Sequence, residues 1–167
     1  MKSSICEECL KKNVLCDTCN KKLAARKTSA EEIDVLRFIY KLSEKNASLK
    51  DVKIVRVLDQ SALLIVTGRG DAAKLVGKGG TIVKLIAKKY KKSIRILEEA
   101  PNFNRFVENL LNPADVSGIN TLYKDSEEIT RIRVPEFQRN RMILTPEDFS
   151  QVVSCFFKKK AELVFDV

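Results

Sequence analysis

A short glycine-rich segment, Leu75 to Val83, sets the tightest limit on how this chain can fold. Apolar Leu75 and Val76 lead into Gly77-Lys78-Gly79-Gly80, and an amphipathic helix is predicted from Thr81. Glycine has no Cβ, so the backbone can approach a partner closely at this loop. The helix directs its free N–H groups and the positive end of its dipole at the loop, which suits a phosphate. The spacing excludes a nucleotide P-loop and a dinucleotide fingerprint. The alternative is a plain glycine turn between two elements. The flanking residues have to decide between this turn and a phosphate-binding loop.

The residues around this loop are strongly basic. No acidic residue lies between Asp71 and Glu98, and the interval holds the following basic residues: Lys74, Lys78, Lys84, Lys88, Lys89, Lys91, Lys92 and Arg95. Lys84, Lys88 and Lys92 are spaced by four and are predicted to share one helical face. The formal net charge is +9 with a pI near 9.4, which favours nucleic acid or another polyanion as the partner. A solvated basic surface is the alternative interpretation.

The composition favours a cytoplasmic protein that is not an enzyme. The chain has no histidine, the commonest general acid or base near neutral pH. It has no apolar run of about 18 residues, and its first residues lack the apolar region of a signal peptide. We therefore expect neither a membrane partner nor a small-molecule substrate.

Four of the five cysteines form two Cys-x-x-Cys pairs near the N-terminus: Cys6, Cys9, Cys16 and Cys19. In a cytosolic chain this clustering favours a metal over disulfides. Four thiolates suit a structural Zn²⁺ with no open position for catalysis. The alternatives are redox-active or free cysteines and a rubredoxin-like iron site. The segment has too few apolar residues for a core of its own, so the metal is expected to hold it together. Cys155 falls in an apolar helix and is predicted to be buried.

The predicted elements describe an α+β chain that repeats one plan. A zinc-binding module, residues 1–27, precedes two domains, 28–99 and 100–167. Each domain has the order helix, strand, strand, helix, helix, strand around a three-stranded sheet. In the first domain the elements are predicted at 29–45, 52–58, 62–67, 72–76, 81–90 and 93–97. In the second they begin at Asn102 and continue at 119–123, 129–134, 139–143, from Thr145, and at 162–165.

This order, with the glycine loop between the two consecutive helices and ahead of the last one, resembles a type II KH domain, whose Gly-x-x-Gly loop clamps about four nucleotides of single-stranded nucleic acid. Two phrases in the second domain resemble the second KH module of NusA proteins: Asn112-Pro113-Ala114-Asp115-Val116 and Val134-Pro135-Glu136-Phe137-Gln138. The resemblance spans roughly residues 29–166 and points to small archaeal NusA-like proteins. It implies binding of single-stranded RNA in transcription elongation or termination, with RNA polymerase or the ribosome as candidate partner complexes.

The RNA contacts implied by this resemblance lie in the first domain. They are the loop residues Gly77, Lys78, Gly79 and Gly80 and the basic residues Lys74, Lys84, Lys88 and Arg69. Bases would lie in a groove between the loop and the sheet edge. The residues Ile65, Val76, Val83 and Ile86 are candidates for its apolar floor, with the core as the alternative for most of them.

The second domain departs from the pattern. It has Leu144-Thr145-Pro146-Glu147 at the matching place, and Pro146 lacks an N–H while Glu147 and Asp148 bring negative charge. We expect this second loop not to bind RNA. The cysteine cluster also lies outside the usual tandem. Two alternatives therefore remain: a protein-interaction adaptor that docks through the zinc module and the second domain, or a ribosomal-RNA or ribosome-assembly factor.

Overall fold

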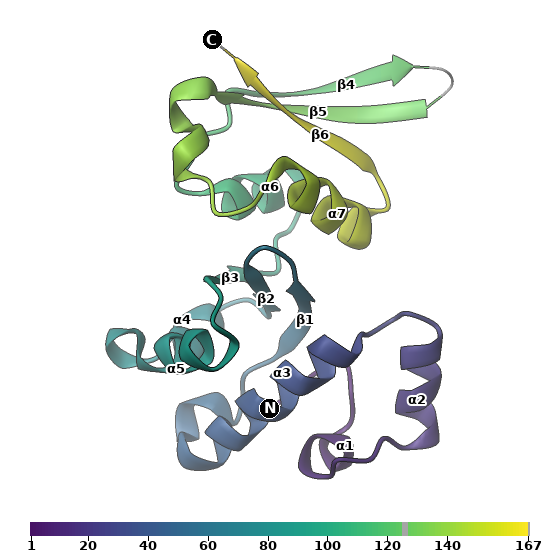
Figure 1. Ribbon diagram of the computed structural model, residues 1–167, viewed down its shortest axis with the longest axis vertical. Helices are drawn as coiled ribbons and strands as arrows, with labels where there is room; N and C mark the ends of the chain where they lie inside the picture. Colours follow the sequence, from purple (N-terminus) through teal and green to yellow (C-terminus); the bar gives the residue numbers. More distant parts are fainter. Residues whose placement is uncertain (125–126, 167) are drawn as a thin grey trace. The chain divides into compact units, whose positions relative to one another are not determined.

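The structure is a computed structural model that describes residues 1–124 and 127–166 (Figure 1). The chain forms two compact units, Met1–Glu99 and Ala100–Val167. Each unit contains one three-stranded sheet, with the strand orders β1-β2-β3 and β4-β5-β6. The predicted α+β class with two three-stranded sheets is therefore confirmed.

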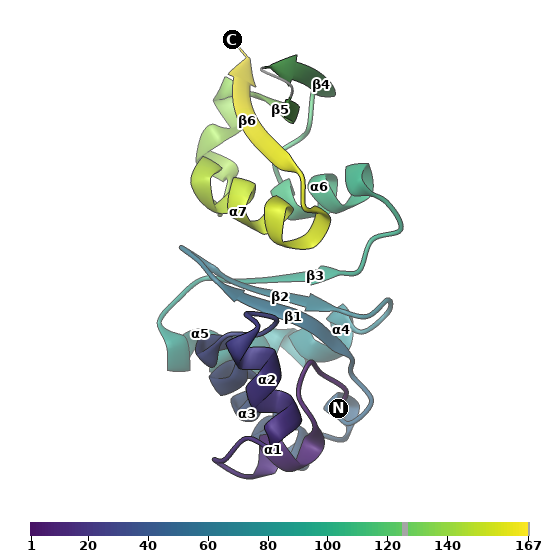
Figure 2. The ribbon, with the colours of Figure 1, turned by 90° about the vertical axis from the view of Figure 1, so that its right-hand side faces the viewer.

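In the first unit the helices α3, α4 and α5 lie on one face of the sheet (Figure 2). Strand β2 is central, antiparallel to β1 and parallel to β3, with Ile65 opposite Ile96. All five β2 residues are buried, which explains why this strand is a continuous apolar run. The elements of this unit are α1 (Glu7–Lys11), α2 (Asp17–Ala24), α3 (Ala30–Lys45), η1 (Ala47–Leu49), β1 (Ile54–Asp59), β2 (Leu63–Thr67), α4 (Ala72–Val76), η2 (Lys78–Gly80), α5 (Thr81–Tyr90) and β3 (Ile94–Glu98).

The four-cysteine segment is part of the first unit's core. Ile5, Cys9, Leu10 and Cys19 are buried in the same apolar cluster as the inner face of α3. Lys2 also forms a parallel bridge beside β1, donating to the Val52 carbonyl (2.9 Å) and accepting from Ile54 N–H (2.8 Å). The few apolar residues of this segment thus pack into the core that residues 28–99 build.

A buried carboxylate, Glu32, ties the N-terminal segment to α3 and β1. Its side chain is 1% exposed. It accepts hydrogen bonds from the Ser4 hydroxyl (3.2 Å), the Thr28 hydroxyl (3.0 Å) and Val57 N–H (3.3 Å), and Arg56 lies 3.7 Å away. Ser29 caps α3 by accepting the Glu32 N–H (3.0 Å), as its position before the helix predicts.

The second unit repeats the order of elements. Helices α6 and α7 lie on one face of its sheet (Figure 1), and phenylalanines from the two helices contact one another in edge-to-face and tilted pairs. Its elements are α6 (Phe103–Leu111), β4 (Gly118–Lys124), β5 (Glu127–Pro135), η3 (Glu136–Arg141), α7 (Pro146–Phe157) and β6 (Lys160–Asp166).

Two predictions for the second unit were wrong. The short helix expected at 139–143 is the 3-10 segment η3, which starts at Glu136, directly after Pro135 ends β5. Cys155 is exposed, because the core-facing positions of α7 are Phe149, Val152 and Val153, and residue 155 falls outside that stripe.

The two phrases that resemble NusA meet in space. The Gln138 side chain accepts the Asp115 N–H and donates to the Asp115 carboxylate (3.1 Å). Gln138 is buried, so this paired hydrogen bond fixes the turn after α6 against η3.

Candidate nucleic-acid interface and metal centre

The glycine loop connects α4 to α5 through backbone that other residues rarely adopt. Gly77 has φ 75°, Gly79 has φ 63° and Gly80 has φ 72°. The Gly80 N–H closes the turn by donating to the Gly77 carbonyl (3.0 Å). A Cβ on Gly77 would lie 2.9 Å from the Ile82 side chain, whereas one on Gly79 would meet nothing within 4 Å. Gly77 is therefore required for packing, and Gly79 leaves its outer side open to a partner.

The N-terminus of α5 faces this loop with no side chain capping it. Its N-cap is Gly80, and the helix runs for ten residues to Tyr90. The first N–H groups and the positive dipole end of such a helix attract anions. The Lys84 amine lies 3.3 Å from the Gly79 carbonyl, which places a cation over the loop.

The predicted basic residues have different surroundings in the structure. Lys78, Lys84, Lys88 and Arg69 are exposed. Lys74 is also exposed but forms an ion pair with Asp71 (2.8 Å).

The predicted stripe Lys84, Lys88, Lys92 is wrong in its last member. Helix α5 ends at Tyr90, and the Lys92 amine instead binds the Asp59 carboxylate and the Gln60 carbonyl (2.9 Å). The left-handed Lys91 (φ 52°) ends the helix before residue 92 can join its face.

Asp71 fixes the turn that leads into α4. Its carboxylate accepts the Lys53 N–H (2.9 Å) as well as the Lys74 ammonium. These two donors lower the pKa of Asp71, Lys74 being the larger influence. Asp71 is buried, so we assign it to shaping this turn.

An apolar groove of about 300 Å³ lies between the loop and the edge strand β3. Val76 and Val83 line it, whereas Ile65 and Ile86 are fully buried in the core, the other role that the sequence indicated for them. The sequence analysis placed the groove at the sheet edge but did not identify the β3 residues, which the alternation of this edge strand could have indicated. The lining residues are Val76, Gly80, Val83, Lys84, Ile94, Arg95 and Ile96.

The matching place in the second unit has the opposite character. Thr145 caps α7, accepting the Asp148 N–H (3.2 Å), and Pro146 follows at the first helical position. Acidic Glu147 and Asp148 occupy the first turn. Here the helix terminus is already satisfied and is electrostatically unfavourable for a phosphate.

The net charges of the two units differ in the same direction as their helix termini, basic in the first unit and acidic in the second. Residues 1–99 contain 22 Lys and Arg against 12 Asp and Glu, a net charge of +10. Residues 100–167 contain 9 against 10, a net charge of −1. Attraction for a polyanion is therefore concentrated in the unit that contains the glycine loop.

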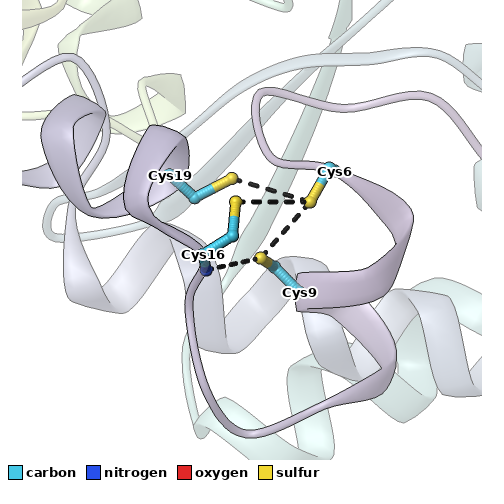
Figure 3. A group of neighbouring side chains, drawn as sticks. All are labelled: Cys6, Cys9, Cys16 and Cys19. Atoms are coloured by element: carbon cyan, nitrogen blue, oxygen red, sulfur yellow. Dashed lines mark hydrogen bonds between the residues drawn. The ribbon is translucent and has the colours of Figure 1, made fainter.

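The four N-terminal cysteines point toward one another from the starts of α1 and α2 (Figure 3). Their sulfur atoms all lie within 4.8 Å of one another. The Cys6 sulfur is 3.3 Å from that of Cys9 and 3.8 Å from those of Cys16 and Cys19. Tetrahedral zinc with Zn–S bonds of about 2.3 Å places its sulfurs about 3.8 Å apart. The donor set and its spacing therefore fit such an ion.

The thiols of Cys9 and Cys16 differ in how readily they lose a proton. The Cys16 amide donates to the Cys9 sulfur (3.1 Å) and lowers the pKa of Cys9, but burial and the neighbouring thiols outweigh it and raise that pKa to about 12. Hydrogen bonds from the Cys19 amide and thiol lower the pKa of Cys16 to about 7. Of these two thiols Cys16 therefore loses its proton more readily, and a bound cation would compensate the charge of a Cys9 thiolate.

The centre is braced from α3. The Arg37 Nε donates to the Cys9 carbonyl (2.9 Å), and the Tyr40 hydroxyl donates to the Glu7 carboxylate (3.0 Å). The Lys22 amine donates to the Ser4 carbonyl (2.7 Å). The first two bonds hold the Cys6–Cys9 pair against α3, the helix that carries the core of the unit, and the third joins α2 to the segment before Cys6.

Among solved structures, the crystal structure of APE1850 shares the fold. It matches with a TM-score of 0.58 and 22% sequence identity, covering 83% of this chain and 99% of that one. No family model matches the chain. In the described part of the chain, every helix is too short or too polar to cross a membrane.

A curated relative, the "Probable transcription termination protein NusA" of Methanocaldococcus jannaschii, is 26% identical over 97 residues. The match covers 58% of this chain and 50% of that protein, so it spans about half the length of the relative. This match supports a relationship to NusA-like proteins.

Proposed function

We propose that the first unit is a type II KH domain that binds single-stranded RNA, and that the chain is a NusA-like factor of transcription elongation or termination. The observation that carries the proposal is the glycine loop at the uncapped N-terminus of α5, beside an apolar groove and within an acid-free basic interval. The likeness to the archaeal NusA protein supports the role in transcription.

Each part of the site has a role in this proposal. Backbone N–H groups at the loop and the Lys78 ammonium hold phosphates. Lys84, Lys88 and the exposed Arg69 attract the strand, and bases lie in the groove against Val76 and Val83. No step of this binding changes a covalent bond, and we propose that the protein is not an enzyme.

The four cysteines are proposed to bind a structural Zn²⁺. When bound, the ion cross-links the starts of α1 and α2 and adds its binding free energy to the folding of the first unit. Cys6, Cys9, Cys16 and Cys19 would occupy all four positions, so the ion would have no site for a substrate.

The test is RNA binding across a salt series by wild type and the loop variant Lys78→Asp/Gly79→Asp. For wild type and single strands, log K should fall by about 0.7 per phosphate neutralised for each tenfold rise in salt concentration. A matched control, Lys41→Asp/Ser48→Asp, changes the net charge equally at exposed residues of α3 and η1. We expect the loop variant to lose binding and the control to keep most of it. Equal affinities of a folded loop variant and its control would refute the clamp.

A second candidate is the adaptor function, favoured by the second unit's net charge of −1 and its capped α7. In that case the second unit and the cysteine module dock on a protein complex, and the basic unit only assists. The loop variant would then still co-purify with its partner complex after nuclease treatment. Loss of the partner under those conditions would exclude the adaptor function.

A further inference from the structure

The described strands leave four sheet edges, and one of them is unprotected. Natural proteins blunt the edges of their sheets with charged residues, prolines, bulges or covering segments, because an open edge pairs readily with another strand. Strand β1 carries Arg56 and Asp59, has an irregular register between Ile54 and Arg56, and pairs with Lys2 at one end.

The edges β3 and β6 are likewise protected by charge. Strand β3 carries Arg95 and Glu98 and borders the groove. Strand β6 carries Lys160, Glu162 and Asp166.

Strand β4 has none of these protections along its middle. Its sequence, Gly-Ile-Asn-Thr-Leu-Tyr-Lys, contains no proline and no acid, and its one charge is at the final residue, Lys124. Its register with β5 is continuous from Gly118 to Lys124, so no bulge turns the edge away. Residues 120–124 are exposed, including Leu122 at 38% and Tyr123 at 80%. A strand of this length and character is a template for a further strand.

The sequence of β4 is complementary to itself. In an antiparallel pair of two copies centred on Thr121, Thr121 faces its own counterpart and all seven residues overlap. Ile119 lies opposite Tyr123 twice, an aromatic and β-branched pair that stabilises sheets, as a Thr–Thr pair also does. Lys124 lies opposite Gly118, so no like charges meet.

We propose that two copies of this chain associate through β4, joining their second-unit sheets into one six-stranded sheet. This inference is independent of RNA binding, because it rests on residues of the second unit alone. The shared edge makes a two-fold symmetric contact, the commonest symmetry of homodimers. A single strand pair is a small interface, so the dimer is weak and depends on concentration.

Sedimentation velocity of the full chain over roughly 5–500 µM tests the proposal, a range chosen for a small interface. The wild-type mass should rise toward twice the 18.9 kDa of the chain. Thr121→Lys and Thr121→Glu each place like charges opposite one another and should remain monomeric. An equal mixture of the two variants should dimerise again, because Lys then faces Glu. Thr121 is exposed, and far-UV circular dichroism checks that both variants fold.

Ser154→Lys is the control for added charge, at an exposed position of α7, and should dimerise as wild type does. A wild type that stays monomeric to the highest concentration overturns the proposal. So does a dimer that survives Thr121→Lys, because it must use another surface, or a mixture of the charged variants that fails to associate.

Discussion

Replacing the buried Glu32 with alanine should destabilise the first unit by about 3–5 kcal/mol, the range for breaking a buried charged network. The carboxylate joins three segments that are far apart in sequence: Ser4 before the first cysteine, Thr28 before α3, and Val57 in β1. Alanine at this position removes the acceptor and leaves its donors behind.

The magnitude follows from the separate contacts. The Val57 N–H loses an acceptor in a buried setting, which costs about 1–3 kcal/mol. Arg56 is 26% exposed and keeps its bond to the Lys27 carbonyl (2.8 Å), so losing its partner costs only about 1 kcal/mol. The buried methylenes add about 1 kcal/mol. Glu32→Gln keeps one acceptor oxygen and the packing, so it should cost about 1–2 kcal/mol.

Urea unfolding followed by far-UV circular dichroism measures the effect, and tyrosine fluorescence serves as the second probe because the chain has no tryptophan. With a slope of about 1–3 kcal/mol per molar urea, the first-unit midpoint should fall by about 2 M for Glu32→Ala. Glu128→Ala, in the exposed start of β5, is the control and should leave this transition unchanged. A loss below about 1 kcal/mol, or equal effects of alanine and glutamine, would show that the network around Glu32 does not hold the three segments together.

Three further predictions concern the loop, its turn and the metal centre. Gly77→Ala should destabilise the first unit by about 1–3 kcal/mol and Gly79→Ala by about 1 kcal/mol, because only Gly77 adds a close contact to its positive φ; thermal unfolding compares them. The lowered pKa of Asp71 means that its charged form stabilises the fold above pH 4 or so, and that this contribution is lost as the pH falls through the lowered value. The stability gap between wild type and Asp71→Asn should therefore close in acid, and an unchanged gap would contradict the role of Lys74. A chelator should lower the unfolding midpoint of the first unit only, which urea unfolding with and without the chelator measures. Zinc affinity should weaken as the pH falls, because the raised pKa of Cys9 means that the ion displaces a proton; competition with a metal-sensitive dye measures this affinity.

Local sequence signals predicted most of the fold. Ser29, Asn102 and Thr145 each cap the expected helix. The predicted helices 72–76 and 81–90 agree with α4 and α5. Helix caps, glycines and apolar periodicity depend only on residues that are close in the chain, so they can be recognised from the sequence alone.

Features that depend on distant residues were not predictable. Thr28 and Ser29 each precede a glutamate by three residues, a pattern in which the glutamate side chain returns to its own helix start. The Glu32 carboxylate does accept the Thr28 hydroxyl there, but it also accepts from the Ser4 hydroxyl and from Val57 N–H, partners supplied by tertiary folding.

The candidate site was predicted unevenly for the same reason. The loop and the cysteine pairs are contiguous and could be found directly. The groove also needs Ile94 and Ile96 from β3, and the loss of Lys92 from the helical stripe depends on its bond to Asp59.

The two loops of the duplicated plan follow different backbone paths, and this limits how one could be engineered into the other. In the second unit Met142 (φ −74°, ψ 137°) and Thr145 (φ −72°, ψ 159°) are extended, whereas Gly77, Gly79 and Gly80 have positive φ. Residues 142–145 directly precede α7, as Gly77–Gly80 directly precede α5 in the structure, two residues before the place that the sequence indicated. Grafting Gly-Lys-Gly-Gly onto residues 142–145 would supply the side chains of the first loop without its turn, and Pro146 and the acidic first turn of α7 would remain. To give the second unit the proposed RNA-binding loop, the whole segment from the end of β5 into α7 would have to be exchanged. For the same reason, no single substitution can convert the second loop to the backbone conformation of the first.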